Sequence, residues 1–363
     1  MRRLTLVTAV LGLLACQRVP VALDGPPVPD VGPDGPPSLP WVSTYAGTGC
    51  GGDGSDGPRL KTGFGYVHDV TSDPATGEIY FVATMVHVIR GDQIVTLAGP
   101  VNGSRQKDGP ALETSFDTLR AIALGADSAV FVAEDNRVRK IQGGMVSTLA
   151  GAHTQPSQHV DGPASAARFV EIRALAIDFD GGLLIADVYG IRKLKDGVVS
   201  TIAGSGPFTG YPTAGGDGPA TEVQLRGTSG LLVESDGILF GEGHRIRRLR
   251  NGQIQTLAGT TQDTRFPQPR DGPLDQALFV AIRTLRRRGG RLYFVDYPNT
   301  HIRMIENDQV TTINPLTRDG MHDGPLDHAL FDTPSSALAL FGSTDLLVAD
   351  TGNCRLRLIQ LAE

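Results

Sequence analysis

The sequence predicts an all-β protein, a six-bladed β-propeller made of four-stranded antiparallel blades. Three observations lead to this prediction. An Asp-Gly-Pro motif recurs six times at steps of 52 to 56 residues, a large apolar residue follows each motif at a fixed distance, and each unit has four short apolar stretches. A small sheet that is apolar on both faces must stack on its neighbours, and six such sheets around an axis form a propeller.

The Asp-Gly-Pro motif sets the register of the repeat. Its copies begin at Asp56, Asp108, Asp161, Asp217, Asp271 and Asp323. Eight residues after these aspartates come Phe64, Phe116, Phe169, Leu225, Phe279 and Phe331. We expect these residues to fill the gaps between blades, because large apolar residues at a fixed register are usually core. Since proline suits the first turn of a helix and aspartate can cap it, each motif is also expected to open one short helical turn.

Four strands per unit follow from the apolar stretches and the turns between them. In the third copy the stretches are 174–178, 182–187, 191–194 and 198–204, and Lys195-Asp196-Gly197 separates the last two. Asp-Gly dipeptides favour tight hairpins because they tolerate positive φ angles. Each unit is therefore predicted to be one small antiparallel sheet.

The stretch WVSTYAG at 41–47 closes the ring. Near-copies of it end earlier units, for example VSTIAG at 199–204, whereas the sixth unit shows only 346–350 and 356–359 after its first strand. We predict that 41–47 completes the last blade as its outer strand. This pairing removes the open sheet edge that an incomplete blade exposes.

A disulfide between Cys50 and Cys354 is predicted from the same closure. Cys50 follows the closing strand by three residues, and Cys354 immediately precedes the strand with which that segment should pair. Antiparallel neighbours bring the two positions to one end of one blade, and an exported chain meets oxidising conditions. The alternative is two unpaired thiols.

The first forty residues are expected to lie outside the propeller. Residues 1–15 combine a positive head with a short apolar run, which indicates a secretion signal. Leu13-Leu14-Ala15-Cys16 resembles the bacterial lipoprotein box, and this resemblance implies cleavage before Cys16 and its lipidation. An ordinary signal peptide with an incidental cysteine is the alternative. Residues 16–40 then form a Pro/Gly-rich tether, and 41–363 form the propeller.

Composition narrows the possible partners. The chain has a net charge of −6, with 46 glycines and only 20% charged residues. An acidic chain is a poor general binder of nucleic acids, so no nucleic-acid partner is expected. Apart from the signal, no segment is apolar enough to cross a membrane.

The repeat resembles a known family. LLVADTGNCRLRLI at 346–359, together with the recurring order of Asp-Gly-Pro, Phe, Ile-Ala-Asp, Ile-Arg-Lys-Leu and Val-Ser-Thr-Ile-Ala-Gly, is similar to the NHL repeat over essentially all of 41–363. The resemblance implies a β-propeller, commonly six-bladed, and many bacterial members are exported. The first unit departs from the pattern, because 81–89 lacks both the acid after the second strand and the arginine of the third.

The entry of each inner strand supplies the candidate binding residues. Four positions after the fixed Phe or Leu, at the predicted mouth of the central channel, lie His68, Arg120, Arg173, Ser229, Arg283 and Ser335, with Ser336 as an equal choice in the last unit. Guanidinium groups suit recognition of carboxylate, phosphate or sulfate. A protein, peptide or acidic glycan is therefore the expected ligand on this face.

A structural alternative exists for these arginines. The second strands end at the same face, so that Arg120 can pair with Glu134, Arg173 with Asp187, and Arg283 with Asp296. A second arginine set is expected to form a repeated structural pair on the third strands, and it comprises Arg139, Arg192, Arg247, Arg303 and Arg357. Arg286-Arg287-Arg288 is expected to be a solvated turn.

The sequence favours a binding or scaffold function. The eight histidines share no position in the repeat, so no metal, cofactor or catalytic residue is predicted. We therefore expect a membrane-tethered propeller of the bacterial cell envelope, in the outer membrane, which binds its ligand at the channel mouth. The alternative, by similarity to other propeller families, is a metal-dependent lactonase or lyase that uses the central channel, where only His68 stands at an expected ligand position.

Overall fold

The computed structural model of the chain describes residues 40–361 except 53, 100–106, 153–157, 208–214, 261–267, 299–300, 317, 334–337 and 343. Contacts divide the chain into two units, Met1–Pro36 and Pro37–Glu363, and the described residues lie in the second. Cys16, the predicted signal and nearly all of the tether therefore lie outside the described residues.

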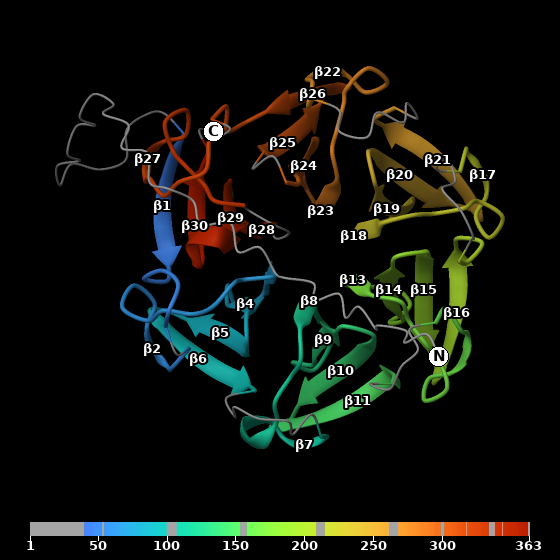
Figure 1. Cartoon of the computed structure of the whole chain (residues 1–363), viewed down its shortest axis with the longest axis horizontal. Helices are drawn as coiled ribbons and strands as arrows, with labels where there is room; N and C mark the ends of the chain where they lie inside the picture. Colours follow the sequence, from blue (N-terminus) through green and yellow to red (C-terminus); the bar gives the residue numbers. More distant parts are fainter. Residues whose placement is uncertain are drawn as a thin grey trace, which may run out of the picture. The chain divides into compact units, whose positions relative to one another are not determined.

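Six antiparallel sheets form a ring around a central channel, as predicted (Figure 1). The inner strands are β3 (Asp69–Ser72), β8 (Leu119–Leu124), β13 (Ile172–Ile177), β18 (Thr228–Glu234), β23 (Ile282–Arg288) and β28 (Leu338–Phe341). The second strands are β4 (Ile79–Val82), β9 (Val130–Glu134), β14 (Leu183–Asp187), β19 (Gly237–Glu242), β24 (Arg291–Asp296) and β29 (Asp345–Asp350). We number the blades 1 to 6 in the order of these inner strands.

The outer half of each blade consists of a third and a fourth strand. The third strands are β5 (Val86–Arg90), β10 (Arg137–Gln142), β15 (Gly190–Lys195), β20 (Arg245–Arg250), β25 (His301–Glu306) and β30 (Arg355–Gln360). The fourth strands are β6 (Gln93–Ala98), β11 (Met145–Gly151), β16 (Val198–Ala203), β21 (Gln253–Ala258), β26 (Gln309–Thr312) and, in blade 6, β1 (Trp41–Ala46).

A fifth, two-residue strand corrects the predicted count of four. The Gly-Pro of each motif pairs with the start of the fourth strand, giving β2 (Gly57–Pro58), β7 (Gly109–Pro110), β12 (Gly162–Pro163), β17 (Gly218–Pro219), β22 (Gly272–Pro273) and β27 (Gly324–Pro325). Proline lacks an N–H and fits a sheet only where that donor is not needed, as at an edge. The prediction missed this strand because it assigned the motif to a helix start.

Helical structure is limited to two short 3₁₀ turns among the described residues. They are η1 (Ala111–Glu113), which follows the motif of blade 2, and η2 (Thr351–Asn353). The expected capping by the motif aspartate is wrong, because η1 has no side-chain cap. The described part of the chain contains no helix that is long and apolar enough to cross a membrane.

The chain closes its ring with its own N-terminal strand, as predicted. β1 lies between β30 and β27, and its register with β30 runs from Trp41 opposite Gln360 to Ala46 opposite Leu356. Figure 1 shows the blue β1 inside the red sheet of blade 6. The predicted disulfide between Cys50 and Cys354 is present and joins positions 304 residues apart. Ring closure is therefore both hydrogen-bonded and covalent.

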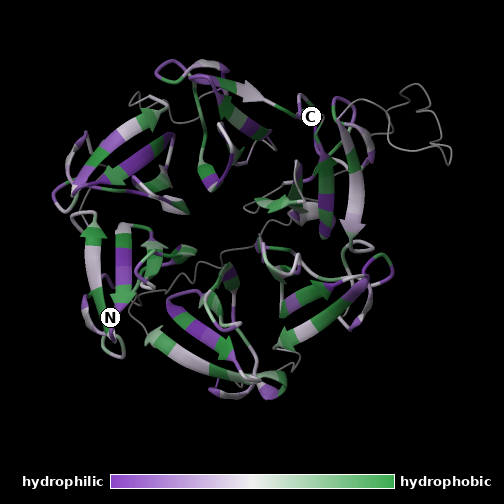
Figure 2. Cartoon of the chain, turned by 180° about the vertical axis from the view of Figure 1, so that it is seen from behind, coloured by the Kyte–Doolittle hydropathy of each residue, from purple (hydrophilic) through white to green (hydrophobic). Residues whose placement is uncertain are grey.

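The hydrophobic core lies between adjacent blades. The cluster around Phe169, which is 1% exposed, combines Val138 and Ala150 of blade 2 with Leu175 and Ile185 of blade 3. Figure 2 shows the corresponding alternation of hydrophobic and hydrophilic bands along the strands. The large apolar residue at fixed register therefore packs at the interface between blades, as predicted.

A buried arginine on the third strand ties each of blades 2 to 6 together. We call the set Arg139, Arg192, Arg247, Arg303 and Arg357 the arginine clamps; each side chain is fully buried. Every clamp binds the acid that ends the second strand and also the motif aspartate of its blade. The predicted repeated structural pair is confirmed, and it has a second acid that the sequence analysis did not assign.

Blade 5 illustrates how a clamp binds its partners. In blade 5, Arg303 Nη1 lies 3.0 Å from Asp296 Oδ2, and Nη2 lies 2.6 Å from Asp271 Oδ1. Its guanidinium also lies 5.0 Å from the ring centre of Phe279, and three further clamps stack on the equivalent Phe. Cation–π contacts of this kind gain strength when they are desolvated. One cation thus connects the second strand, the motif and the interblade apolar residue.

The motif aspartates also hold the outer strands. Each accepts the backbone N–H of one threonine in its fourth strand, which is Thr96, Thr148, Thr201, Thr256, Thr312 or, in blade 6, Thr44. Thr44 belongs to β1, so the closing strand enters the same network as its five counterparts. The recurring Thr in the VST-like segments is explained by this bond.

Blade 1 replaces the clamp with a neutral group. His87 stands at the arginine position, and the acid after the second strand is missing, which are the departures noted in the sequence. His87 is fully buried, stacks on Phe81 at 4.9 Å, and its pKa is lowered to about 4 by burial. Blade 1 therefore keeps the packing of the clamp without its buried ion pairs.

We expect removal of a clamp arginine to lower the free energy of unfolding far more than removal of a surface arginine. Arg303→Gln leaves Asp296 buried without its cation, and loss of one partner of a buried pair costs about 3–5 kcal/mol. Arg291→Gln is the matched control, because Arg291 pairs with Glu306 at the surface, where a pair contributes about 0–1 kcal/mol. Urea unfolding of both variants measures the difference; equal losses of unfolding free energy contradict this role of the clamp.

Candidate functional site

The starts of the inner strands meet in one cavity at an end of the central channel. The cavity has a volume of about 350 Å³ and is lined by His68, Arg120, Arg173, Ser229 and Arg283, which are five of the six predicted mouth residues. Ser335 and its alternative Ser336 lie outside the described residues. Thr333 and Thr351 line the cavity from blade 6. We call this cavity the mouth.

The acids predicted to pair with the mouth arginines are wrong, although Arg120 and Arg173 do form ion pairs with other acids. Glu134 and Asp296 are bound by Arg139 and Arg303 at 2.8 and 3.0 Å, and Asp187 by Arg192 at 3.4 Å. These carboxylates are at most 1% exposed, so they face the blade interior and not the channel. The clamps therefore take the acids that were expected to neutralise Arg120, Arg173 and Arg283.

Glu171 is the acid that the mouth does contain, and sequence analysis missed it. Its carboxylate lies 3.6 Å from Arg120 Nη1 and 3.3 Å from Arg173 Nε, so it bridges two blades. Its backbone φ of +99° is unusual for a residue with a side chain. The sequence held a signal, because Tyr66, Glu171 and Thr333 all follow the fixed apolar residue by two positions and all line the mouth.

Arg283 lacks an acidic partner within the described part of the chain. Its guanidinium lies 4.7 Å from the ring centre of Tyr297, and its Nε is buried without a hydrogen-bond partner. Burial, followed by the charge of Arg173, lowers the pKa of Arg283. Arginine nevertheless stays protonated in proteins, so a cation with unused donors faces the mouth.

His68 and Ser229 add little charge to the mouth. Burial and then the nearby Arg120 lower the pKa of His68, so its imidazole is neutral at pH 7. The Ser229 hydroxyl is 3% exposed and donates a hydrogen bond to the Ile282 carbonyl of the next blade. Ser229 therefore helps to join blades 4 and 5, and its oxygen can only accept from a ligand.

The mouth as a whole is a small cationic cavity. Three guanidinium groups line it against the carboxylate of Glu171, while Asp135 contacts Arg120 at 3.3 Å from outside the lining. Such donors suit planar anions, above all carboxylates. Among the residues that the structure describes, no three His, Cys, Asp or Glu side chains are grouped so that they could hold a metal ion.

Comparison with known proteins finds distant relatives by sequence. No family model matches the chain. It is 27% identical to human Teneurin-4 (Homo sapiens) over 255 residues, which cover 64% of this chain and 9% of that protein. It is 29% identical to Teneurin-3 of Danio rerio over 162 residues, covering 40% of this chain and 6% of that protein. The chain thus spans less than a tenth of the length of these relatives.

Solved structures with the same fold include binding proteins and enzymes. An auxiliary nutrient binding protein from Bacteroides ovatus matches with a TM-score of 0.64 and 14% identity, covering 89% of this chain and 76% of that one. A gluconolactonase from Xanthomonas campestris matches with a TM-score of 0.52 and 12% identity, covering 82% and 86%. At such low identity the likeness shows the β-propeller fold alone.

Proposed function

We propose that the chain is an exported, lipid-anchored propeller of the NHL-repeat type that binds a carboxylate-bearing ligand in its mouth. Arg283 is the observation on which the proposal rests: it faces the mouth without an acidic partner in the described structure, whereas every clamp has two. Arginine donors of this kind form strong, often bidentate hydrogen bonds with carboxylates. An acidic glycan or an acidic peptide segment provides the matching carboxylates.

The ligand enters a site that is already partly filled by Glu171. The carboxylate of Glu171 touches Arg120 and Arg173 but forms no ion pair with Arg283. A ligand carboxylate can therefore bind first to Arg283, while a second one must displace Glu171 from its two arginines. This order favours ligands with two or more closely spaced carboxylates.

A scaffold role fits the lipid anchor and the tether that the sequence predicts. Such a tether would let the propeller stand clear of the membrane that anchors it. The fold relative described as an auxiliary nutrient binding protein supports a binding role only by analogy of fold. Nothing in the geometry of the mouth favours the lactonase or lyase alternative over binding.

Removing the mouth arginines is expected to abolish binding of acidic probes. The triple variant Arg120→Gln, Arg173→Gln and Arg283→Gln should bind trigalacturonate and triglutamate at least 10-fold more weakly in calorimetry, because charged hydrogen bonds contribute about 1.5–3 kcal/mol each. The matched control removes three surface arginines, Arg90, Arg250 and Arg291, in the same way. Equal binding by both triple variants, or no binding by the wild type, refutes the proposal.

Neutralising Glu171 is expected to strengthen binding. Glu171→Gln removes the internal carboxylate that competes for Arg120 and Arg173, so the affinity for trigalacturonate should rise several-fold. Glu113→Gln, an exposed acid on η1, removes the same charge elsewhere and serves as the control. An unchanged or weaker affinity in Glu171→Gln shows that Glu171 does not compete with the ligand.

Lipidation is tested on the full-length chain in a bacterial host. Cys16→Ser should lose incorporation of a labelled palmitate analogue, because it removes the residue that is predicted to carry the acyl chains. The variant should also leave the membrane fraction, because stable anchoring needs such chains. The double variant Cys50→Ser and Cys354→Ser changes the other two cysteines and should keep the label. Retained label in Cys16→Ser contradicts the anchor.

A further inference from the structure

A second, larger cavity lies at the opposite end of the central channel. It has a volume of about 570 Å³ and is lined by the ends of the inner strands, whereas the mouth is lined by their starts. A neighbouring cavity of about 600 Å³ shares Thr71–Pro74 and Arg286 with it. Both fall within the size range of small-molecule sites. We call the 570 Å³ space the lower cavity.

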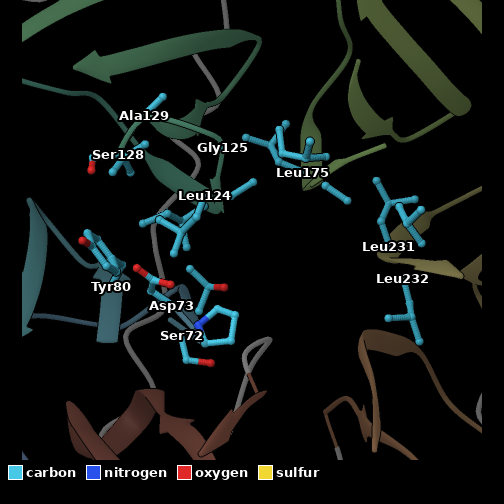
Figure 3. Close-up of a pocket in the computed structure, with 18 of the residues that line it drawn as sticks. Ser72, Asp73, Tyr80, Leu124, Gly125, Ser128, Ala129, Leu175, Leu231 and Leu232 are labelled. Carbon is cyan, nitrogen blue, oxygen red and sulfur yellow. The ribbon is translucent and has the colours of Figure 1, made fainter. Parts of the chain in front are cut away.

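One wall of the lower cavity is apolar. Leu124 of β8, Leu175 of β13, and Leu231 and Leu232 of β18 line it from three successive blades, and Ile122, Ile177 and Val233 extend the wall. Figure 3 shows these labelled leucines around the open space, with Ser72, Asp73 and Tyr80 of blade 1 on another side. Apolar walls that a ligand can cover gain free energy in proportion to the area removed from water.

Among the described residues that line this cavity, Arg286 is the only cation. The run 286–288 is not the solvated turn that the sequence suggested, because β23 extends to Arg288 and the next two residues form the turn. Arg287 contacts Glu234 of blade 4, and Arg288 donates to the carbonyls of Gly342 and Asp345 in blade 6. Arg286 donates only one hydrogen bond in the described structure, to the Leu285 carbonyl at 2.9 Å.

The acids near Arg286 are engaged by backbone groups. Asp69 accepts the N–H of Val70 and of Ile122 at 2.9 Å each, and it forms no ion pair with Arg286 within the described part of the chain. Asp73, which lines the cavity, accepts the Ala75 N–H and the Thr76 hydroxyl within its own turn. Asp127 lies on the turn between β8 and β9. The unused N–H groups of Arg286 thus lack a directly bound protein carboxylate.

Arg286 is partly buried where it lines the cavity. Burial lowers the pKa of Arg286 and raises the pKa of Asp69 to about 6, even though each charge stabilises the other. Both shifts indicate a poorly solvated part of the channel, where a direct contact between opposite charges is stronger than in water.

We propose that the lower cavity is a second ligand site, which binds a small monocarboxylate with an apolar body. Its carboxylate pairs with the free N–H groups of Arg286, and its apolar body covers the leucine wall formed by β8, β13 and β18. This site is separate from the mouth, because it lies at the other end of the inner strands and shares no lining residue with it.

Calorimetry with octanoate on the purified protein tests the proposal. Wild type is expected to bind octanoate at least 10-fold more tightly than octanol, which lacks the charge, and than acetate, which lacks the apolar body. Arg286→Gln should weaken octanoate binding at least 10-fold. Arg287→Gln is the matched control, since it removes the adjacent arginine whose partner Glu234 lies outside the cavity lining, and it should bind like wild type.

The outcomes separate this site from the mouth and from a folding defect. The triple mouth variant should keep octanoate binding while it loses trigalacturonate. Val233→Trp narrows the lower cavity while keeping the Arg286 side chain, and it should also weaken octanoate binding. This variant tests the site even if Arg286→Gln does not fold. The proposal is overturned if wild type does not bind octanoate, if octanol binds as tightly, or if folded Arg286→Gln binds like wild type.

Discussion

The buried guanidinium of the clamp is the interaction on which the rest of this propeller depends. It is a cation in the dry interior of a blade, and such burial is tolerable only where hydrogen-bonded anions compensate for the lost solvation. The motif aspartate, the acid of the second strand and nearby carbonyls supply these acceptors. The motif, the fourth strand and the second strand are therefore fixed to one point in five blades, and in four of them the guanidinium also stacks on the Phe at the blade interface.

The clamps also determine the charge of the mouth. A protein with a net charge of −6 has enough acids to neutralise three arginines at the channel entrance. The acids that end the second strands, however, are directed into the blades, where the clamps bind them. The positive mouth is therefore a consequence of how the fold distributes its carboxylates, and the overall charge of the chain gives no indication of it. Glu171 reaches the mouth because it lies outside this repeated arrangement.

Much of the architecture was predictable because a repeat gives the same information six times. The interblade residue, the closing strand, the disulfide and the positions of the mouth residues all follow from register. Register did not show which arginine binds Glu134. Arg120 on the inner strand and Arg139 on the third strand both flank the strand that Glu134 ends, and only the direction of the side chains decides between them. Glu171 and the course of 286–288 were also missed, since the acid and the arginine run each occur in a single blade, although the position of Glu171 recurs as Tyr66 and Thr333.

The closing strand has a mechanical consequence. A pull on the chain at the N-terminal side of Trp41 is borne by the hydrogen bonds of β1 to β30 and β27 before it reaches the rest of the ring. The bond between Cys50 and Cys354 lies at the far end of β1 and limits how far the strand can slide. A module held by its N-terminal end would therefore resist tension at the seam where a ring is usually weakest.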